Sequence, residues 1–107
     1  MGIEYVIYKK RNSAGRCSLS HLLATGRRPM RRHYAPAWRG YEEPPAGRRD
    51  VQRLLERLYA KYSLVPPEGD AAGRMQIGDI VSLKISRRER FFYCDAIGFS
   101  ELASFEN

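Results

Sequence analysis

The sequence predicts an α+β domain with a small antiparallel sheet of three or four strands, one main amphipathic helix and one short helix. Stretches near both ends of the chain alternate between apolar and polar residues, as β-strands do, and one stretch in the middle has the apolar spacing of a helix. The chain has 107 residues, of which 43% are hydrophobic, and this suits one domain with one modest core. We therefore expect a single domain over residues 1–107.

The first two predicted elements are a strand and a short helix. IEYVIY at 3–8 is β-branched and aromatic, with alternate apolar side chains on one face. Leucines at helical spacing follow in 18–26, where Ser18 can cap the helix start and Gly26 suits the left-handed position after the helix end.

Residues 27–49 are predicted to form a long loop rich in arginine and aromatic residues. Prolines and glycines interrupt any regular pattern there: Pro29, Pro36, Gly40, Pro44, Pro45 and Gly47. A loop of this length without regular structure is uncommon inside a compact domain and tends to be functional or disordered.

The main helix is expected at 50–63, capped by Asp50 and stopped by Pro66-Pro67, with apolar residues at Val51, Leu54, Leu55, Leu58, Tyr59 and Tyr62. Residues 77–97 then predict a β-hairpin, with strands at 77–85 and 91–97 joined by a loop at 86–90. The tail at 100–105 is expected to pack a final turn on the sheet.

The chain is basic, with a formal charge of +7, and 15 of its 19 cationic side chains are arginines. Guanidinium groups bind phosphates and carboxylates bidentately and stack on aromatic rings. GC-rich codon usage gives the same bias, so the alternative of a surface that serves only solubility stays open. No apolar run is long enough for a membrane span, and the N-terminus is unlike a secretory signal, so we expect a cytoplasmic protein with no membrane contact.

Cys94 followed by Asp95 invites comparison with an active site. Adjacent side chains of a strand point to opposite faces, so these two residues cannot act on one substrate. Cys94 shares its face with Phe92 and Ala96, an apolar setting in which a thiol is inert. We therefore predict that the protein is not an enzyme and has no small-molecule substrate.

A metal site is the other chemistry that the cysteines suggest. Cys17, His21, His33 and Cys94 could supply four ligands, but zinc sites are usually built from closely spaced ligand pairs. Packed or surface side chains explain these residues as well. We predict two free thiols, no metal and no cofactor.

The arginine-rich loop carries the predicted binding surface. Cations for phosphates and rings for stacking alternate along it, a mixture that suits RNA or single-stranded nucleic acid. The same residue types are frequent hot spots of protein interfaces, and a loop whose rings fold back on the core is a third reading. The predicted contact residues are Arg27, Arg28, Arg31, Arg32, Trp38, Arg39, Tyr41, Arg48, Arg49, Arg53, Arg87, Arg88 and Arg90.

Four stretches at the chain ends share a pattern: IEYVIYK at 3–9, MQIGDIVSL at 75–83, YCDAIGF at 93–99 and ELASF at 101–105. Together they resemble the YodL-like family of small domains, whose most characteristic positions are filled by Asp79, Asp95, Gly98 and Phe99. Gly78 and Cys94 depart from the pattern, which has Ser and Val there, and the arginine-rich loop is not part of it. We expect both carboxylates to accept hydrogen bonds that fix the strand ends.

The resemblance implies a setting in phages, plasmids and conjugative elements, which are thought to use such proteins against host defences. It implies a non-enzymatic interaction protein that binds and inhibits a host defence nucleoprotein, in the manner of an anti-CRISPR inhibitor of a CRISPR effector nuclease. The alternative is a basic, sequence-nonspecific RNA- or DNA-binding protein of such an element.

Overall fold

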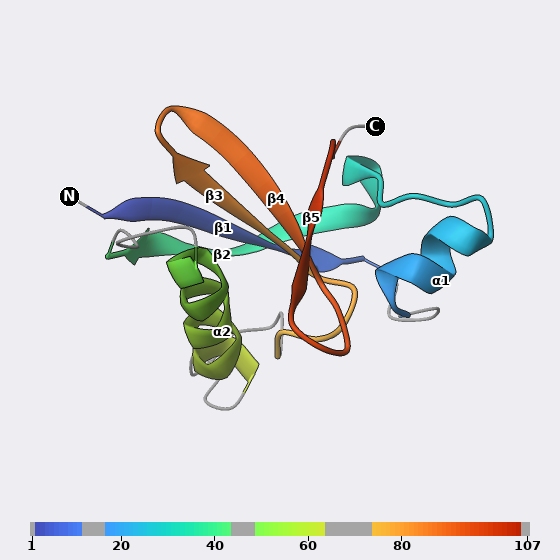
Figure 1. Cartoon of the computed structure of the whole chain (residues 1–107), viewed down its shortest axis with the longest axis horizontal. Coiled ribbons are helices and arrows are strands. Elements are labelled where there is room, and N and C mark those ends of the chain that lie inside the picture. The colour runs from blue at the N-terminus through green and yellow to red at the C-terminus, as the bar shows by residue number, and fades with distance from the viewer. Residues whose placement is uncertain (1, 12–16, 44–48, 64–73, 106–107) are drawn as a thin grey trace.

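Five strands of the computed structural model form one antiparallel sheet, with the order β2-β1-β3-β4-β5. The structure describes residues 2–11, 17–43, 49–63 and 74–105. Its elements are β1 (Ile3–Lys10), α1 (Leu19–Ala24), the 3-10 turn η1 (Arg31–His33), β2 (Tyr34–Glu42), α2 (Arg49–Ser63), β3 (Ile80–Ile85), β4 (Arg88–Cys94) and β5 (Phe99–Leu102). The α+β class is confirmed, but the sheet has five strands instead of three or four (Figure 1).

The loop predicted at 27–49 is wrong over its centre, which forms η1 and the edge strand β2. Tyr8 of β1 pairs with Pro36 and Ile7 pairs with Trp38, so Ala37 is an extra residue in β2. An edge strand with such a bulge tolerates proline, because the missing N–H is not needed for pairing. Pro44, Pro45 and Gly47 lie outside the described residues.

The hairpin predicted at 77–97 is present as β3 and β4, with a shorter turn than expected. Ile85 pairs with Arg88, so the connection consists of Ser86 and Arg87 alone, with φ angles of 51° and 66°. Positive φ at both central residues matches the primed turns that suit the twist of a two-residue hairpin. The tail predicted as a turn instead supplies β5, which pairs with β4.

Both faces of the sheet carry buried residues. On one face α2 packs its fully buried Leu54, Leu55 and Leu58 against alternate residues of the strands. On the other face a smaller cluster joins α1, the strands and the C-terminal segment, and consists of Leu19, Tyr34, Ile80, Tyr93 and Phe105. No helix among the described residues is long and apolar enough to cross a membrane.

Candidate functional site: a basic pocket

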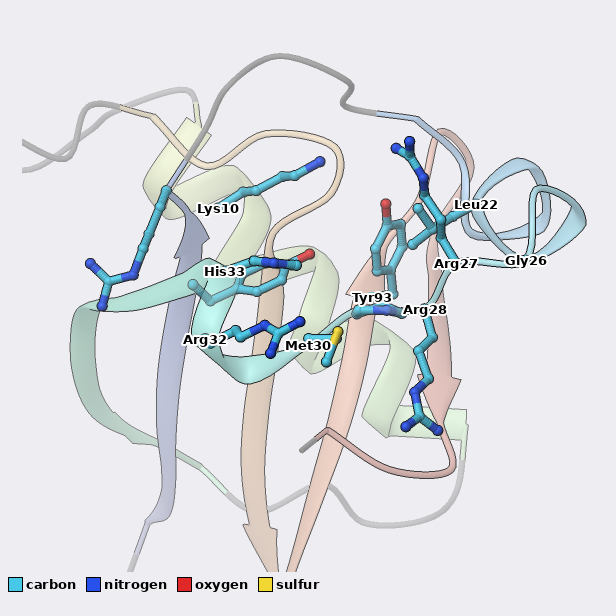
Figure 2. A pocket seen from close by; sticks show the side chains of 12 residues that line it. Lys10, Leu22, Gly26, Arg27, Arg28, Met30, Arg32, His33 and Tyr93 are labelled. Atoms are coloured by element: carbon cyan, nitrogen blue, oxygen red, sulfur yellow. The ribbon is translucent and has the colours of Figure 1, made fainter. Parts of the chain in front are cut away.

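A pocket of about 680 Å³ opens beside the ends of β1 and β4, where the segment from α1 to η1 runs alongside the sheet. Its lining residues are Lys10, Arg11, Leu22, Gly26, Arg27, Arg28, Pro29, Met30, Arg32, His33, Tyr34 and Tyr93. Figure 2 shows Lys10 and Arg27 reaching toward the pocket from different sides, with Arg32, His33 and Met30 on the η1 side. We call this feature the basic pocket.

The end of α1 fixes where Arg27 and Arg28 leave the helix. Gly26 has a φ of 77°, and its N–H donates to Leu23 O (3.0 Å), while Arg27 N–H donates to Leu22 O (3.1 Å). These two bonds form a Schellman motif, in which glycine takes the left-handed position at no steric cost. The sharp turn at Gly26, which the sequence predicted, therefore directs the two arginines to the wall of the basic pocket.

The turn η1 supplies the opposite wall and separates two neighbouring arginines. Arg32 and His33 line the basic pocket, whereas the Arg31 guanidinium lies 5.4 Å from the Tyr8 ring, 5.3 Å from Phe91 and 5.0 Å from Phe105. Arg31 also donates to Phe105 O (3.3 Å) and to the Tyr8 hydroxyl (3.3 Å). The predicted contact residue Arg31 is thus part of the protein's own packing.

Backbone contacts join η1 to the strand that supplies the remaining cations. Arg11 N–H donates to His33 O at 2.8 Å, just beyond the end of β1. The cations at positions 10 and 11 are therefore held beside Arg32, although more than twenty residues separate them in the sequence. In the part of the chain that the structure describes, three separate segments supply cationic side chains to the basic pocket.

The floor of the basic pocket is apolar. Tyr34 and Tyr93 are almost fully buried, at 5% and 2% exposure. Their hydroxyls donate to Gly78 O and Cys17 O, both at 2.7 Å, so these polar ends already have partners. Because the two rings are almost fully buried, the half-buried side chains of Leu22 and Met30 supply the accessible carbon surface of the floor.

The rim of the basic pocket is positively charged. Among the described residues, its lining contains no aspartate or glutamate, and no ion pair involves Arg27, Arg28 or Arg32. These three arginines are exposed, so their guanidinium groups can reach a ligand. Such a rim attracts an anion, and guanidinium groups are suited to the oxygens of a phosphate.

Asp79 fixes the end of β1 beside the basic pocket. Its side chain is fully buried and accepts hydrogen bonds from Lys10 N (3.1 Å), Gln76 N (2.8 Å) and the Lys9 ammonium (3.2 Å). Lys9 also donates to Arg74 O. Asp79 thus has the hydrogen bonds expected of a residue that holds a strand end.

Asp95 makes the corresponding contacts on the side of α1. It accepts from Leu19 N (3.1 Å) at the helix start and from the Ser100 hydroxyl (3.1 Å) at the start of β5. Gly98 has a φ of 70° and its carbonyl accepts from Asp95 N, which closes the tight connection between β4 and β5. Phe99 packs partly buried against the core beneath α2.

A model of the YodL-like domain matches residues 18–105. The chain belongs to the YodL-like domain family. The matched range begins after β1, so the resemblance seen at residues 3–9 lies outside it, although β1 pairs with both β2 and β3 in the sheet. Comparisons with curated proteins and with solved structures find no match.

In this YodL-like domain two predicted contact residues of β2 are surface residues and a third is not. Trp38 is only 7% exposed, and its ring stacks on Tyr62 of α2 with centroids 4.7 Å apart. The interpretation of Trp38 as a stacking platform for a partner is therefore wrong, because its ring belongs to the core. Arg39 is exposed and Tyr41 is 70% exposed, but neither lines the basic pocket.

The other predicted arginines of the YodL-like domain lie away from the basic pocket. Arg87 and Arg88 are exposed at the hairpin turn, which is at the opposite end of β3 and β4 from Tyr93. Arg90 forms a bidentate ion pair with Glu101, at 2.7 and 2.8 Å, and this pair lowers the pKa of Glu101 and raises that of Arg90. Arg53 is exposed on α2, Arg49 is the first residue of α2, and Arg48 lies outside the described residues.

Sequence reasoning missed two basic residues of the pocket as contact residues: Lys10 and Arg11. The run of cations that ends the first strand was visible in the sequence, but the register that places it beside η1 was not. Cys94 is buried among apolar residues on the α2 face, and no group of three or more potential metal ligands is found in the described part of the chain.

Proposed function

We propose that this YodL-like domain is a non-enzymatic protein that binds the phosphates of a nucleic acid through its basic pocket. The observation that carries the proposal is the cationic rim, to which three described segments contribute and whose described lining residues include no carboxylate. Phosphate contacts supply most of the sequence-independent affinity of proteins for nucleic acids. The proposed partner is therefore RNA or DNA bound without strong sequence preference.

The test is the dependence of affinity on salt, measured by fluorescence anisotropy with a labelled oligonucleotide. Each neutralised phosphate contributes about −0.7 to the slope of log K against log salt concentration for a single strand. The double variant Arg27→Ala/Arg28→Ala should weaken binding and reduce the slope by about 1.4, because two phosphate contacts are lost.

Arg87→Ala/Arg88→Ala is the matched control, since it removes the same charge at the far end of the sheet. Its slope should stay close to that of the parent protein. Equal losses in both double variants would show that net charge alone attracts the nucleic acid. Absence of binding at low salt would refute the proposal.

A second function, inhibition of a host defence nucleoprotein such as a CRISPR effector nuclease, is favoured by the outer surface of β2. Arg39 and the largely exposed Tyr41 lie two residues apart there, outside the basic pocket, and both residue types are frequent hot spots of protein interfaces. A pull-down from host lysate with nuclease treatment separates protein contact from nucleic-acid bridging. Capture of an effector that survives nuclease and is lost with Tyr41→Ser would support this function, and capture of no defence component would count against it.

A further inference from the structure

We infer that the basic pocket accepts one unpaired nucleotide of a single strand, and that the protein therefore selects single-stranded over duplex nucleic acid. This inference rests on the proposed function and concerns the form of the ligand. Three features carry it: the hollow shape of the site, its apolar floor and an aromatic side chain at its rim.

The hollow shape suits a nucleotide better than a regular helix. The volume of about 680 Å³ falls within the range of roughly 300–1,000 Å³ that is usual for pockets that enclose small molecules. A duplex keeps its bases stacked inside, so it would have to lose stacking and pairing before a base could enter. An unpaired nucleotide meets no such cost.

The floor and rim divide the pocket into surfaces that suit different parts of a nucleotide. The half-buried side chains of Leu22 and Met30 present carbon surface on which a base can pack. Arg27, Arg28 and Arg32 surround this surface with cations for the phosphates on either side of the base. A pocket for phosphate alone would gain nothing from an apolar floor.

His33 adds an exposed ring beside the floor. It lines the pocket next to Arg32 and lies on the η1 side in Figure 2. Imidazole rings stack on unpaired bases in RNA-binding proteins, and stacking tolerates any base. We assign His33 as the residue that stacks on the bound base.

The binding test compares a single strand of about 12 nucleotides with a hairpin duplex that has the same number of phosphates. The single strand should bind at least about tenfold more tightly at the same salt concentration. A nucleoside monophosphate should also displace the labelled single strand at a concentration at least about tenfold below that required of inorganic phosphate.

Variants of His33 separate stacking from charge. His33→Ala should weaken single-strand binding at least about fivefold, the lower end of what one stacked base contributes. His33→Phe keeps a ring without charge and should retain most of the affinity. Met30→Ser alters the floor outside both core clusters and should reduce single-strand affinity while leaving the salt slope unchanged. The melting temperature of each variant is measured as the control that its fold is intact.

The two proposals fail in different ways. Equal affinity for duplex and single strand, or His33→Phe binding as poorly as His33→Ala, would overturn the unpaired-nucleotide site and leave phosphate binding in place. Loss of all binding to both oligonucleotides at low salt would overturn both.

Discussion

Arg31 and Arg32 are neighbours in η1, yet replacing each with alanine should affect different properties. Arg31 packs against three rings and donates two hydrogen bonds, whereas Arg32 lines the basic pocket without an ion pair to any described residue. We expect Arg31→Ala to lower stability and Arg32→Ala to lower nucleic-acid affinity.

The loss in free energy of unfolding expected for Arg31→Ala follows from the contacts of Arg31. A cation–π contact contributes about 0.5–1 kcal/mol at an exposed site and about 2 kcal/mol when desolvated, so one half-buried guanidinium shared by three rings contributes about 1.5 kcal/mol. Its two hydrogen bonds are long, at 3.3 Å, and add about 0.5 kcal/mol. The total of about 2 kcal/mol corresponds to a decrease of about 8 °C in Tm for a domain of this size.

Thermal unfolding followed by circular dichroism measures this difference. Arg32→Ala should change the free energy of unfolding by less than about 0.5 kcal/mol, as is usual for an exposed side chain. Arg31→Lys keeps the charge but loses the planar group that stacks, and should fall between Arg31→Ala and the parent. If Arg31→Ala and Arg32→Ala have the same Tm, the structural role assigned to Arg31 is wrong.

Three further substitutions test the core. The hydroxyls of Tyr5 and Tyr62 lie 2.6 Å apart, and Tyr62→Phe removes the partner of the Tyr5 hydroxyl. This change should lower the free energy of unfolding, measured in urea, by about 1–3 kcal/mol. The double variant Tyr5→Phe/Tyr62→Phe should cost less than the sum of the two single variants. Burial and this hydrogen bond raise the pKa of Tyr62 from 10.0 to about 12. The neutral phenol therefore stabilises the fold fully below pH 10, and this contribution is lost between pH 10 and 12. The free energy of unfolding of Tyr62→Phe, measured against pH, should lack this loss. Gly40→Ala would place a Cβ 2.6 Å from the Tyr5 hydroxyl and should lower stability by about 1–3 kcal/mol, and an unchanged Tm would show that the ring can move aside. Asp79→Asn removes the negative charge that the Lys9 ammonium contacts. It should lower the free energy of unfolding by about 3 kcal/mol in the same thermal assay, and a decrease of less than about 1 kcal/mol would contradict this role of Asp79.

Elements with a regular local period could be predicted from the sequence. The main helix was expected at 50–63 and is observed at Arg49–Ser63, because its leucine spacing is helical and its buried face is continuous. The hairpin was predicted from two alternating runs, which pair as β3 and β4. The turn was judged too long because Arg88 and Arg90 were read as loop residues, although they pair with Ile85 and Leu83 in the sheet.

Edge strands could not be predicted, because their stability depends on a distant partner. The prolines of β2 argue against a strand only where every N–H must be paired, and Pro36 lies at a bulge on the sheet edge. Trp38 was assigned to a binding surface because the prolines around it made this segment look like a loop. A tryptophan in a loop is free to contact a partner, but one on a strand opposite α2 is in the core.

The basic pocket illustrates the same limit for a binding site. Its arginines at 27, 28 and 32 were predicted as contact residues, whereas the cations at positions 10 and 11 reach the pocket only through a backbone hydrogen bond to η1. The predicted contact arginines divide among the pocket, β2, α2 and the hairpin turn. The proposal of a nucleic-acid ligand starts from charge composition, but only the register of the sheet determines which charges lie together.

Asp79 and Asp95, two of the residues on which the sequence resemblance rests, lie at the points where the pocket is joined to the sheet. Asp79 accepts from Lys10 N, directly before the cations of β1 reach the pocket. Asp95 accepts from Leu19 N and so fixes the start of α1, the helix whose far end directs Arg27 to the opposite wall. Each carboxylate thus positions the backbone of a pocket segment without contributing a side chain to the lining. In this domain Asp79 and Asp95 therefore provide the frame of the pocket, and the arginines provide its charge.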